Sequence, residues 1–289
     1  MRNTIKLILI IPLLFFVVKG FGWYENFYTD SFSSGAGNIK SVPIKGLAVP
    51  TMNPATLTAV SGALFNYTYG MRSVPGYGMM AANFYLPMGD NVFSFNYNSD
   101  FLENVLYEDR YSAAIAFSVT SALNAGIKMN YYRPKISYYD AQDPVFSGNI
   151  YGFGFDGGFL FNIDSFPLTS APVTIGAYFT DLLAVLNNNP LSPNIGGGIR
   201  IDFANYISSL YLDTLIRPQV GTSFEKMYKE FNIGATREIN GFVFSVGLNN
   251  FFFTGGITFE FKNFIISYAY NSKISGGHKF TIGVHINGL

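Results

Sequence analysis

The feature that most constrains this chain is an alternation of large apolar side chains with small or polar ones. In segment 277–287, every second residue is large and apolar: Phe280, Ile282, Val284 and Ile286. The residues between them are polar or small: Thr281, Gly283, His285 and Asn287. A β-strand places successive side chains on opposite faces, so this period of two predicts strands with one apolar face. The same period recurs in 91–99, 148–163, 194–204 and 264–272, which predicts an all-β protein.

The second face of these strands separates two all-β architectures. A soluble sandwich carries Lys and Glu on its outer face, whereas a transmembrane barrel turns its bulky face to lipid and lines its lumen with small and polar residues. Only 12% of the residues are charged, whereas 18% are aromatic, and the chain contains 30 Gly. Gly, Ser, Asn and Thr dominate the second face. The sequence therefore favours a transmembrane antiparallel β-barrel over a secreted soluble sandwich.

The expected strands suit a bacterial outer-membrane barrel in number, length and aromatic content. We expect about fourteen, an even number, with lengths near ten residues, enough for a tilted strand to cross the hydrocarbon. They are 60–71, 76–88, 91–99, 110–120, 123–134, 148–163, 172–181, 194–204, 207–215, 229–238, 241–249, 253–262, 264–272 and 277–287. Aromatic residues near strand ends resemble interfacial girdles: Tyr67, Tyr69, Tyr131, Tyr132, Tyr138, Tyr139 and Phe251 to Phe253.

The connections between these strands mostly alternate in length. Longer ones are expected at 100–109, 134–147, 182–193 and 216–228, where part of the last could add to a strand. Outer-membrane barrels have short periplasmic turns and longer extracellular loops. The pattern therefore places the long connections outside the cell and both chain termini in the periplasm.

The start of the chain has the plan of a secretory signal peptide. Arg2 and Lys6 precede an apolar run at 7–18, and small residues follow at Gly20 and Gly22. The run is shorter than the ~20 apolar residues of a transmembrane helix. We predict that residues 1–20 are a signal peptide that exports the protein, the alternative being an uncleaved N-terminal anchor. Residues 21–59 would then form an N-terminal periplasmic or plug segment, and residues 60–289 the barrel.

The segment before the first strand contains a helix start. Asn53 suits an N-cap and Pro54 suits the first helical position, where its missing N–H costs nothing. With Ala55 they predict a short helical turn at 54–59. Nearby residues are apolar enough to need burial: Val42, Ile44, Leu47, Val49 and Met52. We therefore favour a plug in the lumen over a disordered periplasmic extension.

Charge and residue types exclude several classes of function. There are 18 Lys and Arg against 18 Asp and Glu, which excludes a basic nucleic-acid binder. The absence of Cys excludes thiolate sites, and the two His leave little for a zinc site or a His-based triad. An acid–base cluster of Asp140, Asp143 and His278, or His285 with a lumenal Ser, has no supporting motif. We expect no catalytic residues, no metal and no cofactor, and hence no enzyme.

The alternation predicts which charged side chains face the lumen. They are Lys128, Asp156, Arg200, Asp202, Asp213, Glu238, Glu260, Lys279 and His285. One interpretation is a mixed-charge constriction that orders water and solutes. The other is that these groups pair with each other and with the plug, because ionisable groups in a barrel interior must be paired or hydrated. The excess of acids over bases argues against an anion-selective pore.

Several short motifs are similar to those of a known family. Gly35-Ala36-Gly37, followed by Asn53-Pro54-Ala55 and a strand, resembles the start of PorV/PorQ proteins and of their larger relatives, the FadL family of hydrocarbon and fatty-acid transporters. Segment 263–270, a short loop and then 276–283 resemble the family's ending, and 231–235 resembles one of its inner strands. The resemblance implies a barrel in the cell outer membrane, in contact with the lipid bilayer.

Two functions follow from this resemblance. The PorV/PorQ branch implies a partner-binding barrel in surface protein secretion or assembly, with secreted proteins or secretion machinery as partners. The FadL branch implies passive transport of hydrophobic or small molecules across the outer membrane. The ending of the chain and its compact size favour the PorV/PorQ branch, and the FadL-like role is the alternative.

Overall fold

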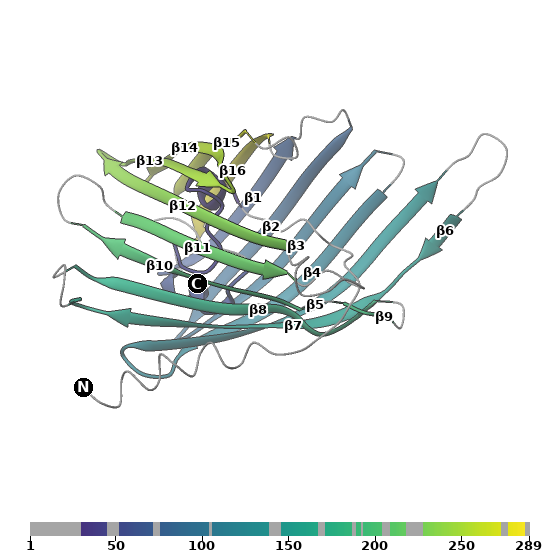
Figure 1. Cartoon of the computed structure of the whole chain (residues 1–289), viewed down its shortest axis with the longest axis horizontal. Coiled ribbons are helices and arrows are strands. Elements are labelled where there is room, and N and C mark those ends of the chain that lie inside the picture. Colours follow the sequence, from purple (N-terminus) through teal and green to yellow (C-terminus); the bar gives the residue numbers. More distant parts are fainter. Residues whose placement is uncertain are drawn as a thin grey trace.

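The protein, described here from a computed structural model, forms one closed antiparallel β-barrel (Figure 1). The structure describes residues 30–44, 52–71, 76–103, 106–138, 146–166, 171–186, 189–191, 193–203, 209–217, 228–272 and 277–286. The predicted signal peptide at residues 1–20 lies outside these ranges.

Fourteen strands make the wall of the barrel, which confirms the predicted fold class and strand number. They are β1 (Ala63–Met71), β2 (Tyr77–Met88), β3 (Asn91–Leu102), β4 (Leu106–Ser118), β5 (Leu123–Tyr138), β7 (Gly152–Ile163), β8 (Val173–Leu186), β10 (Asn194–Asp202), β11 (Ser209–Arg217), β12 (Tyr228–Ile239), β13 (Phe242–Asn249), β14 (Phe252–Phe261), β15 (Phe264–Asn271) and β16 (Gly277–Ile286).

The wall closes because each of these strands pairs with two neighbours. β1 pairs with β16, so the first and last strands meet, and β8 pairs with β10. Two short strands lie beside this path: β6 (Phe146–Asn149) pairs with the end of β5, and β9 (Asn189–Pro190) pairs with the end of β8. Closure leaves no open edge, so the backbone groups of the wall are satisfied inside lipid.

Side chains that alternate along the sequence lie on opposite faces of the wall. In β7, Phe153, Phe155 and Phe159 point outward and are exposed, whereas Gly154 and Gly158 are buried in the lumen. The other strands mostly follow the same rule, with aromatic and branched side chains outside and Gly, Ser, Thr and Asn inside, although four tyrosines are also buried inside: Tyr85, Tyr132, Tyr178 and Tyr211. This arrangement presents an apolar surface to lipid and a polar one to the interior.

Tight hairpins join the C-terminal strands. The β12–β13 turn is formed by Asn240 and Gly241, both with positive φ (51° and 82°), which is the geometry that Asn-Gly pairs favour in two-residue hairpins. The β13–β14 turn uses Asn250 and Phe251, again with positive φ (45° and 72°).

Several predicted long connections are shorter than expected, because the strands continue. β3 runs to Leu102 and β4 begins at Leu106, so most of 100–109 is strand rather than loop. Phe101 and Tyr107 face each other across this pair with ring centroids 6.2 Å apart, and such cross-strand pairs stabilise a sheet. The boundaries at 134–147, 182–193 and 216–228 shift similarly: β5 reaches Tyr138, β8 reaches Leu186, β11 reaches Arg217 and β12 begins at Tyr228.

The expected girdle residue Tyr132 lies on the other face of the wall. Tyr131 points outward, but its neighbour Tyr132 is fully buried in the lumen, where its hydroxyl donates to the Asp181 carboxylate. Adjacent residues of a strand face opposite sides, so only one of this pair can join a girdle.

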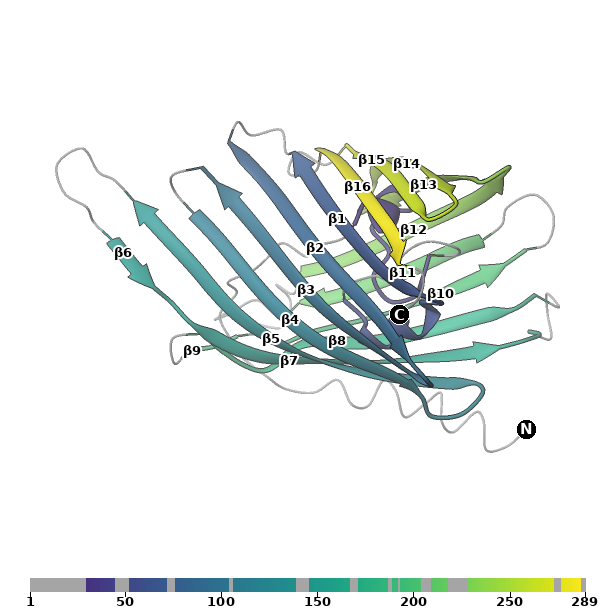
Figure 2. The same ribbon diagram turned by 180° about the vertical axis from the view of Figure 1, so that it is seen from behind.

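Of the described residues, two stretches form helices inside the barrel, α2 (Ser31–Gly35) and the 3₁₀ helix η2 (Pro54–Ala59), seen from both sides in Figures 1 and 2. The predicted helical turn at 54–59 is thus confirmed, with Asn53 as its N-cap. Within the described ranges, no helix is long and apolar enough to cross a membrane.

Candidate functional site

The candidate site is the contact between the N-terminal segment and the lumenal wall. We call residues 30–44 and 52–59 the plug segment. α2 packs against β13 to β16, whereas η2 packs against β3, β4, β5 and β7, so the segment reaches from one side of the lumen to the other. Its apolar side chains are buried: Phe32, Ala36, Ile39, Val42, Ile44, Met52, Ala55 and Leu57.

Local sequence explains how α2 begins and ends. The Asp30 carboxylate accepts a hydrogen bond from the Ser33 amide at 2.8 Å, as an N-cap does. After the helix, Gly37 and Asn38 adopt positive φ (88° and 67°). The backbone N–H of Asn38 donates to the Ser33 carbonyl at 2.7 Å. These left-handed residues stop the helix and turn the chain back toward the wall.

Side-chain hydrogen bonds join α2 to the C-terminal strands. One helix hydroxyl is hydrogen-bonded to a hydroxyl of the wall, and another accepts from a lysine ammonium of the wall. A third bond joins a threonine hydroxyl of the wall to the last carbonyl of the helix. These bonds are Ser31 Oγ to Thr281 Oγ1 at 2.7 Å, Lys279 Nζ to Ser34 Oγ at 2.8 Å, and Thr254 Oγ1 to Gly35 O at 3.0 Å.

Burial raises the pKa of the Asp30 carboxyl from 3.8 to about 6, although the Ser33 amide and the positive charge of Lys279 act in the opposite direction. A buried carboxylate loses its hydration, so the neutral form is favoured. The docked plug segment therefore holds a proton on Asp30 more tightly than a free segment would.

We expect docking of the plug segment to weaken as the pH rises. The extra stability is fully present below the free-segment pKa of 3.8 and is lost as the pH passes through about 6. Hydrogen exchange of residues 30–44, corrected for intrinsic rates, should be slower near pH 4 than above pH 7. Asp30→Asn keeps the N-cap acceptor but cannot titrate, so its protection should not change across this window. An equal pH response in wild type and variant would contradict the assignment to Asp30.

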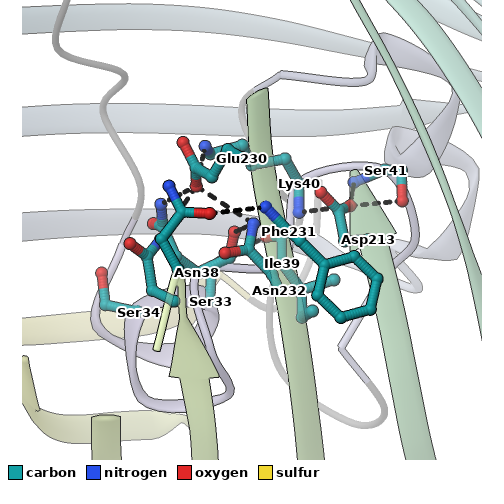
Figure 3. A network of polar contacts seen from close by, with 12 residues as sticks. Ser33, Ser34, Asn38, Ile39, Lys40, Ser41, Asp213, Glu230, Phe231 and Asn232 are labelled. Carbon is teal, nitrogen blue, oxygen red and sulfur yellow. Dashed lines mark hydrogen bonds and ion pairs between the residues drawn. The ribbon is translucent and has the colours of Figure 1, made fainter. Parts of the chain in front are cut away.

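A second group of contacts, drawn in Figure 3, binds the chain after α2 to β11 and β12. Lys40 Nζ lies 2.5 Å from Glu230 Oε1, and the two side chains are 1% and 5% exposed. Asp213 Oδ2 accepts from the Lys40 amide at 3.0 Å, the Ser41 amide at 2.8 Å and the Ser41 hydroxyl. Glu230 Oε1 also accepts hydrogen bonds from three side-chain amides: Asn38 Nδ2 at 3.0 Å, Asn232 Nδ2 at 3.0 Å and Asn249 Nδ2 at 2.8 Å.

The rest of the plug segment is held by backbone carbonyls and by Asn53. Arg200 Nη1 donates to the Pro43 carbonyl at 3.0 Å. Asn53 Oδ1 accepts from the Ala55 amide at 3.0 Å and so caps η2, while its Nδ2 donates to the Ser41 carbonyl at 2.6 Å and to the Phe159 carbonyl at 3.2 Å. Asn53 thus connects both parts of the plug segment to β7.

Glycines on the lumenal face let the plug segment approach the wall. At Gly234 a Cβ would collide with the Ala36 carbonyl oxygen, and at Gly176 with the Ser41 carbonyl oxygen. Only a residue without a side chain allows two backbones to lie this close. These glycines of the wall therefore leave room for the backbone of the plug segment.

A second polar network lies on the wall between β5, β7 and β8. Lys128 Nζ is 2.6 Å from Asp156 Oδ2, and Asp156 Oδ1 accepts from Asn130 Nδ2 at 2.8 Å and from the Asp181 amide at 2.9 Å. The Tyr132 hydroxyl donates to Asp181. These groups are buried, and each charge in the network is balanced or hydrogen-bonded, as buried charges require.

The structure gives the predicted lumenal residues different surroundings. Glu238 is exposed at the end of β12. The others contact each other or the plug segment: Lys128 with Asp156, Arg200 with Asp202 at 3.2 Å, Glu260 with His285 at 3.4 Å, Asp213 with Ser41, and Lys279 with Ser34.

Sequence reasoning missed three charged residues of these networks. Glu230 lies on the same face of β12 as Glu238, so the alternation that placed Glu238 in the lumen also predicts a lumenal position for Glu230. Asp181 breaks the alternation, because the β7–β8 ladder shifts register and Asp181 has a positive φ of 59°, which turns it into the lumen. Lys40 precedes the barrel and carries no local signal.

No protein-family model matches the chain, and no curated protein sequence matches it. Solved barrels do match. The toluene transporter TbuX of Ralstonia pickettii superposes with a TM-score of 0.59 and 16% identity, covering 92% of this chain and 100% of TbuX.

Two further structures cover both chains almost fully. The toluene transporter TodX of Pseudomonas putida gives a TM-score of 0.60 with 13% identity over 92% of this chain and 98% of TodX. A FadL homologue of Pseudomonas aeruginosa gives 0.50 with 9% identity over 92% and 97%. At these identities the likeness concerns the fold. The chain therefore shares its barrel fold with these three proteins.

Proposed function

We propose that the protein is a passive transporter of uncharged, hydrophobic small molecules in the outer membrane, to which a signal peptide at residues 1–20 exports it. The observation that carries the proposal is a barrel whose lumen holds a plug segment through hydrogen bonds and one buried ion pair. Such contacts can break and reform while the wall stays closed, because no wall strand includes the plug segment.

The charges of the lumen support an uncharged substrate. Lys40 pairs with Glu230, Lys128 with Asp156 and Arg200 with Asp202, so neighbouring fields largely cancel. A pore that selects ions instead presents a ring of like charges. The structurally similar TbuX and TodX are toluene transporters, which supports the same substrate class here. The comparisons give no support to the PorV/PorQ-like role in protein secretion.

A reversible lock on the plug segment tests this function. Ser31 Oγ and Thr281 Oγ1 are 2.7 Å apart, and the chain has no Cys, so Ser31→Cys with Thr281→Cys introduces a single pair of thiols that lie side by side and can be oxidised to a disulfide. Uptake of radiolabelled toluene would be followed in Gram-negative cells with an intact lipopolysaccharide layer. We expect wild type to exceed the empty-vector host, the oxidised double variant to fall to the host level, and a reductant to restore uptake.

Each single Cys variant is the matched control, since it changes the contact without closing a bond. Wild-type uptake no higher than that of the empty-vector host would overturn the proposed function. Full uptake by a completely oxidised double variant would show that transport does not require the plug segment to move. Secreted proteins that copurify with the barrel, without toluene uptake, would favour the secretion role instead.

A further inference from the structure

The outer wall carries a groove of about 500 Å³ over β1 to β5. Its floor includes two small outward-facing residues, Ala82 and Ala113, and most of the large side chains around them are aromatic. In the strand register Ala82 lies opposite Tyr97, and Ala113 lies opposite Phe95. Each alanine thus leaves a gap beside a large ring. The groove faces the hydrocarbon, so a lipid chain is the molecule that reaches it.

Tyrosines border the groove along one side. The Tyr97 and Tyr111 rings lie 5.1 Å apart between centroids, and those of Tyr111 and Tyr131 lie 6.1 Å apart. Tyrosine rings at this position are typical of the membrane interface, where one end of the side chain is apolar and the other hydrated.

Cations follow directly beyond this row. The outward face of β5 reads Met129, Tyr131, Arg133 and Lys135, that is, apolar, aromatic and then twice cationic. Arg133 and Lys135 are exposed. At about 3.3 Å per residue, Met129 and Lys135 are roughly 20 Å apart along the strand. This order matches an amphiphile with an apolar chain and an anionic head.

An outward-facing carboxylate of β4 lies near the cations. Asp109 is opposite Arg133 in the strand register and accepts a hydrogen bond from the Tyr97 hydroxyl at 3.0 Å. Among the described residues, the strand register places one carboxylate beside these two cations, which leaves the head position net positive. Asp109 also fixes the Tyr97 ring at the border of the groove.

From this geometry we infer that the wall at β2 to β5 is a binding site for an anionic membrane lipid. Its acyl chain lies in the groove over Ala82 and Ala113, and its phosphate contacts Arg133 and Lys135. These cations lie toward the end of the barrel with the longer connections, so the lipid belongs to the outer leaflet. The inference concerns the exterior of the barrel and does not depend on the transport proposed above.

Native mass spectrometry of the full-length barrel in detergent tests the site. The probes are phosphatidylglycerol and phosphatidylcholine with the same acyl chains, which differ in net head charge. We expect wild type to retain phosphatidylglycerol preferentially. Arg133→Gln with Lys135→Gln should retain both lipids equally. Ala82→Leu with Ala113→Leu fills the groove and should reduce retention of both.

Lys229→Gln is the matched control, because Lys229 is an exposed, outward-facing cation at the corresponding end of β12, above the exposed Phe231 rather than a groove. It should retain phosphatidylglycerol like wild type. Heat-modifiable migration in gels would establish that each variant is folded. Equal retention of the two lipids by wild type would overturn the inference. So would a loss in Lys229→Gln as large as that in the Arg133 and Lys135 variant, because binding would then be non-specific.

Discussion

Replacing Lys40 by Met is expected to release the plug segment from the wall. Lys40 and Glu230 form a buried pair with an N–O distance of 2.5 Å. Removing one partner of a buried pair leaves the other charge uncompensated, which typically costs about 3–5 kcal/mol. Residues 30–44 should then exchange their amide hydrogens much faster than in wild type, and the conductance in planar bilayers should rise. The barrel itself should remain folded, because the backbone ladder of the wall is unchanged.

The double variant Lys40→Met with Glu230→Gln is the control for this explanation. The introduced glutamine amide would be neutral, and its oxygen would still accept hydrogen bonds from Asn38, Asn232 and Asn249, the donors that Glu230 has now. Protection of residues 30–44 from exchange should therefore recover in part. The loss of protection in the double variant should be smaller than the sum of the losses in the two single variants. Wild-type protection in Lys40→Met alone would show that the ion pair does not hold the plug segment.

Gly234→Val should displace the plug segment by collision rather than by loss of charge. A side chain at Gly234 would meet the Ala36 carbonyl oxygen, a backbone atom that cannot move without the chain around it. Overpacking of this kind costs about 1–3 kcal/mol and occasionally more. We expect the conductance to rise toward that of a variant lacking residues 27–50. Gly176→Val, which collides with the Ser41 carbonyl, should act in the same direction.

Gly255→Val is the matched control on the outward face of β14. There the nearest atom to a new Cβ is in the Phe253 side chain at 3.5 Å, an ordinary contact. The control should insert, migrate as a folded barrel and keep wild-type conductance. If Gly234→Val also kept wild-type conductance and slow exchange of residues 30–44, the plug segment would not depend on close packing against the wall.

Much of the wall could be predicted from local rules. Alternation along each strand assigned residues such as Phe153 and Ile282 to the outside and Thr281 to the inside, because side chains of a strand point to opposite faces. Where the local geometry departs from a regular ladder, alternation alone does not place a residue: Asp181 is inside because of the irregular β7–β8 pairing.

By itself, the sequence determined the strands, their two faces and the helical turn that Asn53 caps, since each depends on residues close together in the chain. It also predicted closure, because an apolar outer face in lipid requires a wall without open edges. Only the tertiary structure decided that Lys40 meets Glu230, that Ser41 meets Asp213, and that Ala82 and Ala113 share one groove. Lys40 and Glu230 are 190 residues apart. Contacts between such distant residues depend on the register of strands around the whole barrel and on how the plug segment lies across it, and no short pattern along the chain encodes either.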